Sequence, residues 1–334
     1  MDVAISGSLK SRGVNHSETV QQAESEPIAA RPSDPRRSAE RSTPLPQGNT
    51  IHLRPTATLA ERVLLPGDPG RALALAQFLL ESPLMFNHNR GLWGYTGIAL
   101  DGEPLTIQST GMGGPSAAIV LHELISLGVT RAIRVGTCGA LDAELRLGDL
   151  VVAHEAIAAD GTSLTLGAKQ LAFADPTLTE ALARRAGSWR EGTHREGRIV
   201  STDLFYERDS TRNANWQAEG ALAVEMEAAT LFTLGANTGI QVACLLAVSD
   251  NLHPDIQPAG YKPELDAGEN LHPDIQPPGY KSELGVGENQ HPDIQPLGYN
   301  LASHGSVARI RIDDHALTQA AEAMGSIALG ALSA

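Results

Sequence analysis

Two patterns of apolar and polar residues recur along the chain. Short, almost wholly apolar runs are typical of strands buried in a sheet, and longer runs rich in Ala and Leu are typical of helices. The short runs span residues 62–65, 105–109, 133–140, 149–153, 197–202 and 240–248. Helical runs end near residues 80, 127 and 235–239, and a last amphipathic helix spans 316–332. This order predicts a single α/β domain of three layers, with a central mixed, largely parallel twisted sheet flanked by helices.

Several of the apolar runs end at residues suited to bind a ligand. Gly67, Gly111, Thr137 and Asp250 each fall at the end of a predicted strand. In open α/β sheets, ligands bind in the crevice outside the carboxyl ends of the strands. We therefore expect these four positions to meet at one edge of the sheet.

The pattern breaks at two places. Residues 1–48 are rich in Ser, Pro, Arg and Glu and have no helical or strand period, so a disordered tail is predicted before a domain spanning 49–334. At about 251–300 a 19-residue unit occurs three times, which we interpret as a duplicated surface loop. The alternative is a metal site built from His253, His272 and His291, whose spacing matches no ligand motif.

Composition narrows the class of protein. The net charge of −14 argues against a nucleic-acid-binding surface, which needs clustered Lys and Arg. Cys138 and Cys244, the two cysteines, lie in apolar runs, as reduced thiols of a cytoplasmic protein do. No apolar stretch approaches the ~20 residues of a membrane span, and the N-terminus lacks the apolar core of a signal peptide. We expect a soluble cytoplasmic protein that binds neither nucleic acid nor membrane.

An anion site is one interpretation of residues 133–140. Arg134 lies inside this apolar run, where an unpaired charge is costly, and Gly136 and Thr137 follow it. The alternative is that Arg134 pairs with an internal carboxylate. The turn from Gly67 to Arg71 joins a strand to a helix, whose N-terminus favours anions. Two arginines, a hydroxyl and backbone donors at one point would fit a tetrahedral oxyanion.

Carboxylates provide the second group of candidates. Glu225 and Glu227 are expected at the start of a helix, where residues two apart do not share a face, so one of them at most should point into a cleft. Asp250 ends a strand with few polar residues and is the candidate general acid. A solvated aspartate that ends the strand is the alternative.

Seven ordered motifs resemble those of the nucleoside phosphorylase I family. They span residues 66–69, 89–97, 111–113, 134–139, 201–206, 224–229 and 248–250. The resemblance covers residues 50–250 and the last helix, and is greatest to bacterial hexameric purine nucleoside phosphorylases, with uridine phosphorylases next. It implies reversible phosphorolysis, in which inorganic phosphate attacks the anomeric carbon of a nucleoside and releases the base and (deoxy)ribose 1-phosphate.

The resemblance also assigns roles to residues. The phosphate would be bound by Gly67, Arg71, Arg134, Thr137 and, from a neighbouring subunit, Arg90. The nucleoside would be bound by Phe205, Glu225, Met226, Glu227 and, again from the neighbour, His52. Within this set Glu227 would hold the ribose 2′ and 3′ hydroxyls, and His52 the 5′-hydroxyl. Asp250 would be the catalytic residue, which protonates or hydrogen-bonds purine N7.

These roles imply the ligands and the assembly. No metal or organic cofactor is required, and phosphate is a co-substrate. Shared sites imply a homo-oligomer, a hexamer built as a trimer of dimers, that acts on purine nucleosides in purine salvage. The purine enzymes carry an arginine that assists the aspartate; here the candidates are Arg309 and Arg311, then His304 and His315.

Three other functions remain as alternatives. Residues 109–116 and 147–149 also resemble uridine phosphorylases, but the segment 213–217 is short where those enzymes read the pyrimidine, and Asp250 favours a purine. A nucleoside hydrolase of the same fold would not need the phosphate arginines. A non-catalytic nucleoside- or phosphate-binding protein could lose Asp250 or Glu227, and both are present. The sequence does not distinguish 6-oxo from 6-amino purines.

Overall fold

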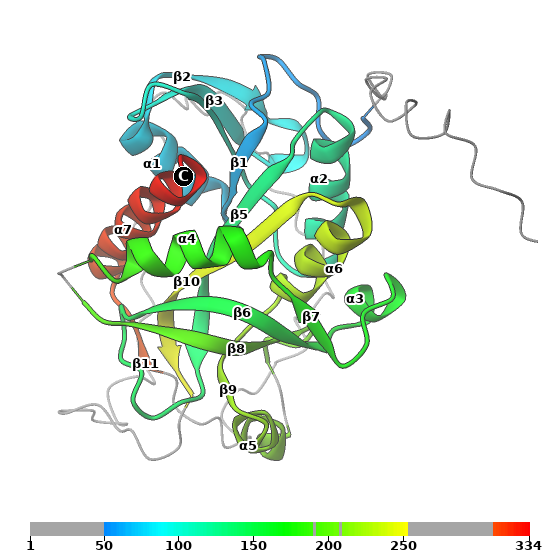
Figure 1. Cartoon of the computed structure of the whole chain (residues 1–334), viewed down its shortest axis with the longest axis vertical. Coiled ribbons are helices and arrows are strands. Elements are labelled where there is room, and N and C mark those ends of the chain that lie inside the picture. Colours follow the sequence, from blue (N-terminus) through cyan, green and yellow to red (C-terminus); the bar gives the residue numbers. More distant parts are fainter. Residues whose placement is uncertain (1–49, 190–191, 207–208, 253–309) are drawn as a thin grey trace, which may run out of the picture. The chain divides into compact units, whose positions relative to one another are not determined.

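A mixed sheet of eleven strands forms the centre of the structure (Figure 1). The computed structural model describes residues 50–189, 192–206, 209–252 and 310–334, which belong to one compact unit, residues 45–334. The predicted tail, the repeat beyond Leu252, Arg309 and His304 lie outside the described residues. All the strands and helices that the sequence pattern predicts fall within the described residues.

Four parallel strands make up the middle of the sheet. They are β4 (Pro104–Gln108), β1 (Arg62–Leu65), β5 (Arg131–Ala140) and β10 (Gln241–Asn251). Beyond β4, the strands β3 (Gly94–Ala99) and β2 (Leu80–Asn87) pair antiparallel and form the edge. The carboxyl ends of the four central strands therefore point to the same edge of the sheet.

The other half of the sheet curls back on itself. It contains β6 (Leu150–Ala159), β8 (His194–Thr202) and β9 (Ala221–Glu225), with the short strands β7 (Leu171–Phe173) and β11 (Ile310–Arg311) at its margins. Successive pairings join β10 to β6, β6 to β8, β8 to β9 and β9 to β5, while β5 also pairs with β10. Five strands thus close a ring, which brings the end of β9 beside the end of β5.

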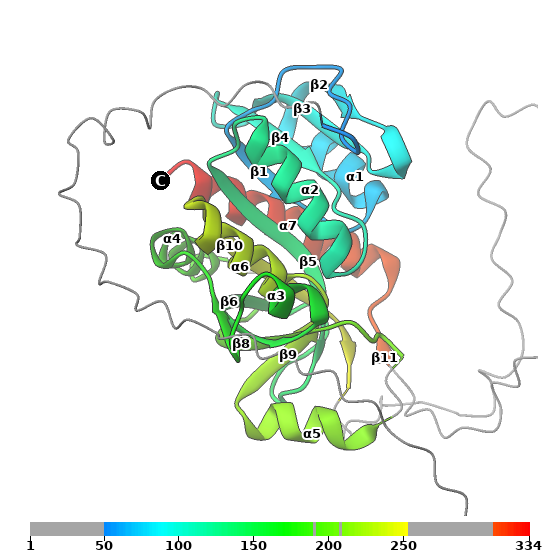
Figure 2. The same ribbon diagram turned by 90° about the vertical axis from the view of Figure 1, so that its right-hand side faces the viewer.

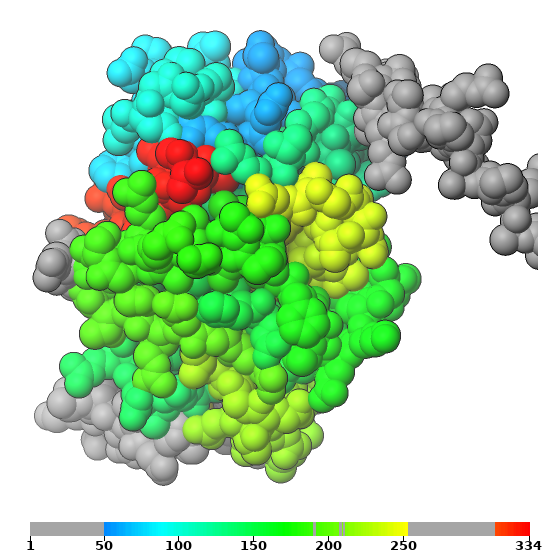
Figure 3. Space-filling view, viewed as in Figure 1, coloured from blue at the N-terminus to red at the C-terminus, as the bar shows by residue number. Residues whose placement is uncertain are grey.

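Helices cover both faces of this sheet, as Figure 2 shows from the side. One face packs against α1 (Pro69–Leu79), α4 (Pro176–Ala186) and α7 (Asp314–Leu332). The other packs against α2 (Gly114–Ser126) and α6 (Ala228–Thr238), beside which lies the short α3 (Gly161–Thr165). Figure 3 shows α4 lying against the end of α7. The helix α5 (Ser210–Ala218) packs near β9, and η3 (Asn89–Gly91) is a single 3₁₀ turn.

The sequence of β10 explains its place in the middle. Val242, Cys244 and Leu246 face one apolar core, while Ala243 and Leu245 face the other. A strand buried on both faces has to be apolar at every position, because successive side chains point to opposite sides. The predicted three-layer α/β architecture is confirmed.

Helix starts follow ordinary capping chemistry. The carboxylate of Asp68 accepts a hydrogen bond from the backbone N–H of Arg71, and Asp313 does the same for Ala316 at the start of α7. Pro69 occupies the first position of α1, where its missing N–H costs nothing. None of the described helices has the length and apolar character needed to cross a bilayer.

Candidate active site

A cavity of about 370 Å³ opens at the carboxyl ends of the central strands. It brings together Gly67 after β1, Gly111 after β4, Thr137 in β5 and Asp250 in β10. The sequence placed these four residues at one edge of the sheet, and the structure does the same. The other predicted residues on the cavity wall are Arg71, Arg134, Phe205, Glu225, Met226 and Glu227.

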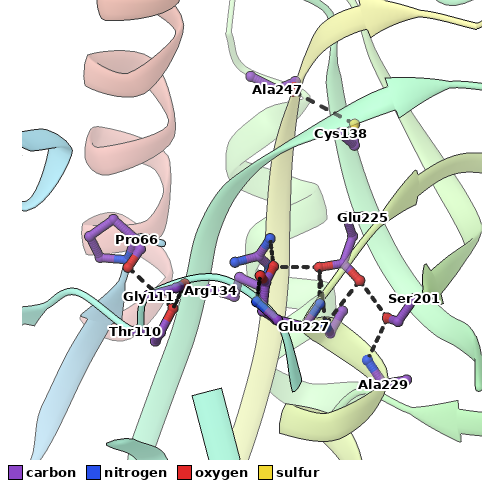
Figure 4. Close-up of polar contacts among 12 residues, drawn as sticks. Pro66, Thr110, Gly111, Arg134, Cys138, Ser201, Glu225, Glu227, Ala229 and Ala247 are labelled. Carbon is purple, nitrogen blue, oxygen red and sulfur yellow. Dashed lines mark hydrogen bonds and ion pairs between the residues drawn. The ribbon is translucent and has the colours of Figure 1, made fainter. Parts of the chain in front are cut away.

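Arg134 is the centre of the charged part of this cavity (Figure 4). Its side chain is almost fully buried, its Nε lies 2.8 Å from Glu225 Oε2, and its Nη2 lies 2.5 Å from Glu227 Oε2. Burial by itself would lower the pKa of Arg134, but the charges of Glu227 and Glu225 outweigh it and raise that pKa above its usual value. The alternative interpretation, that Arg134 pairs with internal carboxylates, is confirmed, and Arg134 also lines the cavity.

Glu225 is held almost entirely by the protein. Its carboxylate accepts hydrogen bonds from the backbone N–H groups of Glu227 and Ala228, at 2.9 and 3.0 Å, and from the hydroxyl of Ser201. Together with Arg134 these donors occupy both of its oxygens. Glu225 therefore holds Arg134 and the start of α6 in place, and it also lines the cavity.

Helical spacing does not describe this pair of glutamates. Glu225 is the last residue of β9, and Glu227 is the N-cap of α6 rather than a residue within it. The backbone bends at Met226 and Glu227, between the strand and the helix. Both carboxylates reach Arg134, whereas the sequence pattern predicted one at most in the cleft.

Glu227 keeps some capacity to bind a ligand. Its Oε1 accepts a hydrogen bond from the backbone N–H of Gly113 at 2.5 Å, and its Oε2 pairs with Arg134. A carboxylate has about four lone-pair directions, so two more donors can be accepted. Burial and the neighbouring Glu225 raise the pKa of Glu227, and Arg134 opposes them. Glu227 thus lines the cavity with capacity to accept further hydrogen bonds.

The arginines leave donors for an anion. Arg134 Nη1 is buried and has no hydrogen-bond partner among the described residues. Arg71 lies on the same wall, and burial lowers its pKa, with Asp68 opposing and Arg134 adding to the decrease. An unpaired buried donor of a charged group costs stability, so a ligand that accepts from Nη1 would be favoured. Gly136 permits this arrangement, since a Cβ there would lie 2.7 Å from the Arg134 guanidinium.

Asp250 lies further along the sheet than Arg134, beside β11. Its Oδ2 accepts a hydrogen bond from the Ser249 hydroxyl at 2.7 Å, and its Oδ1 lies 3.1 Å from Nε of Arg311, without hydrogen-bond alignment. The two residues face each other because β10 and β11 pair antiparallel in that register. Of the predicted partners for Asp250, the structure thus brings Arg311 to it; His315 lies in α7.

Apolar groups also line the cavity. Phe205, Met226 and Leu252 contribute to the wall, and the Phe205 ring packs edge-on against Tyr206 with centroids 5.0 Å apart. A flat apolar surface beside a carboxylic acid suits a heteroaromatic ring that carries polar atoms at its edge. The cavity wall thus combines arginines that could bind an anion, carboxylates that could accept from hydroxyl groups, and apolar side chains that could hold an aromatic ring.

Two predicted residues lie elsewhere on the chain. His52 is bonded to Glu123 of α2, and Arg90 is exposed on η3; neither lines the cavity of its own chain. Arg90 has a backbone φ of 59°, which is uncommon for a residue with a side chain and is often found at functional positions. This placement leaves them available to a second copy of the chain.

Comparison with known proteins identifies the family. The family described as the phosphorylase superfamily matches residues 61–270. The chain belongs to the phosphorylase superfamily. It is 40% identical to the DeoD-type purine nucleoside phosphorylase of Alkaliphilus metalliredigens over 58% of this chain and 84% of that protein. The corresponding protein of Clostridium novyi is 39% identical over the same shares.

Solved structures of the phosphorylase superfamily are also similar. The uridine phosphorylase from Vibrio fischeri matches with a TM-score of 0.54 and 30% identity, over 57% of this chain and 79% of that one. Both the sequence relatives and the structural neighbours therefore carry nucleoside phosphorylase names. The resemblance drawn from the seven motifs is confirmed.

Some contributors to this phosphorylase-superfamily site were missed from the sequence. Ser201 holds Glu225, and the backbone N–H of Gly113 holds Glu227. A hydroxyl inside a predicted apolar strand was the available signal for Ser201, while no sequence pattern singles out one backbone amide.

Among the described residues, no group of three or more His, Cys, Asp or Glu side chains could hold a metal ion. Cys138 and Cys244 are free thiols, and burial raises the pKa of both.

Proposed function

We propose that this protein catalyses the phosphorolysis of purine (deoxy)ribonucleosides to the free base and (deoxy)ribose 1-phosphate, as a pentosyltransferase. The observation that carries the proposal is the ion pair of Arg134 with Glu227 beside a buried, unpartnered Nη1. One guanidinium then serves a phosphate on one side and the sugar-binding carboxylate on the other. The names of the DeoD-type relatives support the same activity.

The anion site would position the nucleophile. Arg71, Arg134 and Thr137 would hold inorganic phosphate, so that one of its oxygens faces the anomeric carbon. Bond cleavage develops positive charge on the sugar, which the phosphate and Glu227 would stabilise electrostatically. The nucleophile is the phosphate, and Cys138 is a packing residue on the cavity wall.

The apolar part of the cavity wall would accept the leaving base. Phe205 would lie against the ring, and Asp250 would donate a proton or a hydrogen bond to purine N7 as the glycosidic bond breaks. Arg311 would assist by placing a positive charge beside Asp250. That positive charge would stabilise the negative charge that the leaving base accumulates. No metal or organic cofactor is needed for these steps, and phosphate is consumed as a co-substrate.

A purine is favoured over uridine by the chemistry at Asp250. The acid stands at the end of the cavity that would receive the base, and purine N7 is a basic atom that it can protonate. The alternative, a uridine phosphorylase, draws on the Vibrio fischeri neighbour. Relative rates on inosine, guanosine and adenosine distinguish a preference for 6-oxo purines from one for 6-amino purines.

The proposed assembly is based on His52 and Arg90, which do not line the cavity of their own chain. Arg134 is already paired with two carboxylates, so a phosphate dianion needs further positive charge, and Arg90 of a neighbouring subunit would supply it. We propose a homo-oligomer with shared sites, a hexamer built as a trimer of dimers, which acts in purine salvage in the cytoplasm.

The decisive experiment measures base release from a panel of nucleosides with and without inorganic phosphate. We expect inosine or guanosine, or adenosine, to be cleaved only when phosphate is present, with ribose 1-phosphate as the second product. Uridine as the sole substrate would overturn the purine assignment. Cleavage without phosphate would overturn the phosphorylase activity in favour of a hydrolase, and binding without turnover would indicate a binding protein.

A further inference from the structure

Glu123, in the last turn of α2, holds the segment that carries His52. Its carboxylate accepts hydrogen bonds from the backbone N–H groups of three successive residues: Ile51 at 3.1 Å, His52 at 3.0 Å and Leu53 at 2.6 Å. The Leu53 side chain is fully buried in the core beside α2. One carboxylate thus fixes the backbone of this segment, although it belongs to a helix 70 residues further along the chain.

The same carboxylate orients the His52 ring. His52 Nδ1 lies 2.8 Å from Glu123 Oε1. An ionised carboxylate only accepts, so Nδ1 must carry the proton, and in the neutral ring Nε2 is left as an acceptor. Burial would raise the pKa of Glu123, but the bonds from Leu53 and His52 outweigh it and keep that pKa below its usual value. The His52 side chain remains a quarter exposed, so a hydroxyl group can reach it.

A second set of hydrogen bonds connects residues 52 and 54 to the turn that contains Arg90. The Asn89 side-chain amide donates to the His52 carbonyl at 2.8 Å, and Asn87 Oδ1 accepts from the Arg54 backbone N–H at 2.9 Å. Asn87 also donates to the Leu92 carbonyl at 2.5 Å, which closes the turn around Arg90. The positive φ of Arg90 is therefore held from both sides.

These contacts join two residues that are far apart in the sequence. We propose that Glu123 is a positioning residue that, with Asn89, presents His52 and Arg90 as one rigid arm to the cavity of a neighbouring subunit, with His52 Nε2 accepting the nucleoside 5′-hydroxyl. The inference rests on the proposed function for its ligand. Its structural half, the anchoring of residues 51–53 by Glu123, does not depend on activity.

Hydrogen exchange tests the structural half. Backbone amides of residues 51–53 should exchange at least about tenfold faster in Glu123→Gln than in the wild type, because a neutral amide is a weaker acceptor and cannot accept through both of its polar atoms. Glu180→Gln is the matched control, since Glu180 is an exposed glutamate on α4 that pairs with Arg184. Unchanged exchange at residues 51–53 would overturn the anchoring role.

Steady-state kinetics with two substrates test the functional half. For inosine at saturating phosphate, Glu123→Gln should raise KM about tenfold, the size of one lost hydrogen bond, with little change in kcat. 5′-Deoxyinosine lacks the hydroxyl group that would donate a hydrogen bond to His52. With this nucleoside, wild type and variant should have the same KM. The double variant with His52→Ala should be no worse than His52→Ala alone.

The outcomes separate the inference from the proposed function. Equal losses on both nucleosides, or further loss in the double variant, would show that Glu123 acts only through stability and would overturn its positioning role. If wild-type protein releases no base from purine nucleosides with phosphate, the proposed function fails together with the functional half. Hydrogen exchange then still decides whether Glu123 anchors the arm.

Discussion

Arg134 and Glu227 form an ion pair, with Nη2 2.5 Å from Oε2, in which both side chains are almost completely buried. One guanidinium therefore borders the proposed phosphate site and also holds the carboxylate that we propose binds the sugar. Loss of one partner leaves the other as an uncompensated buried charge, which is strongly destabilising. We expect variants at this pair to affect phosphate binding, sugar binding and stability together, whereas variants around the pair separate these effects.

Complementation between two inactive variants tests the shared site. Asp250→Asn removes the proposed acid from the site of its own chain, and Arg90→Ala removes the group offered to the neighbour. Each variant alone should lose at least about 100-fold in kcat/KM. In a mixed dimer, one site receives both defects and the other receives neither, so equal co-expression should restore about one quarter of the wild-type sites. Mixtures no more active than the separate variants would exclude sharing of Arg90.

The leaving group tests the role of Asp250. Asp250→Asn should slow inosine phosphorolysis about 10²- to 10⁴-fold, the usual contribution of a general acid. A nucleoside such as 7-methylguanosine already carries a positive charge at N7, so the variant should cleave it at close to the wild-type rate. Arg311→Ala should follow the same ranking with a smaller loss. Equal losses on both nucleosides would remove the acid role of Asp250.

Gly136 tests the fit around Arg134. In Gly136→Ala the new Cβ would lie 2.7 Å from the guanidinium carbon and Nη2, and that group would have to move. We expect KM for phosphate to rise about tenfold, since at least one charge-assisted hydrogen bond is weakened. Gly187→Ala is the control, because its Cβ would make only ordinary contacts of 3.5 Å or more. An unchanged phosphate KM in Gly136→Ala would contradict the proposed anion site.

Arg62 and Asp101 test the pH dependence of stability. They form a two-bond ion pair, Nη1 to Oδ2 at 2.6 Å and Nη2 to Oδ1 at 2.7 Å, and the hydrogen bond from Arg62 lowers the Asp101 pKa well below its usual value. A carboxyl whose pKa is lower in the folded state stabilises that state above its unfolded pKa, about 4, and loses this contribution as pH falls.

Asp101→Asn should therefore reduce the free energy of unfolding by about 1.5 to 3 kcal/mol at pH 7. The difference from the wild type should shrink as the pH is lowered from about 4 towards the folded pKa. Urea denaturation at several pH values measures this, with Asp314→Asn at the exposed first turn of α7 as control. A difference that is constant from pH 7 to pH 3 would show that the pair is not the source.

Much of the fold was predictable because it depends on short-range patterns. Every apolar run singled out became a strand of the sheet, and the last helix begins at Asp314, two residues before its predicted start. The edge strand β2 and its neighbour β3 were not predicted; in β2, residues such as Glu81, Leu84 and Met85 are exposed and mix polar and apolar groups. An edge strand needs only partial burial, so its pattern is weak.

Within the site, the sequence identified residues but not their connections. The strand ends that carry Gly67, Thr137 and Asp250 were expected to meet, because the carboxyl ends of parallel strands lie at the same edge of the sheet. The family motifs assigned roles to these residues. That Glu225 and Glu227 both reach Arg134 depends on the ring of strands that brings β9 to β5. The spacing of two residues was compatible with either outcome until the backbone conformation was known.

The sequence by itself determined the residue types, the three-layer α/β class and the family. Tertiary structure decided which charges pair: Arg134 with two glutamates, Asp250 with Arg311, and Glu123 with the segment that carries His52. The physical reason is that local patterns report burial and periodicity within a few residues. Ion pairs form between strands and helices that only the folded sheet brings within hydrogen-bond distance.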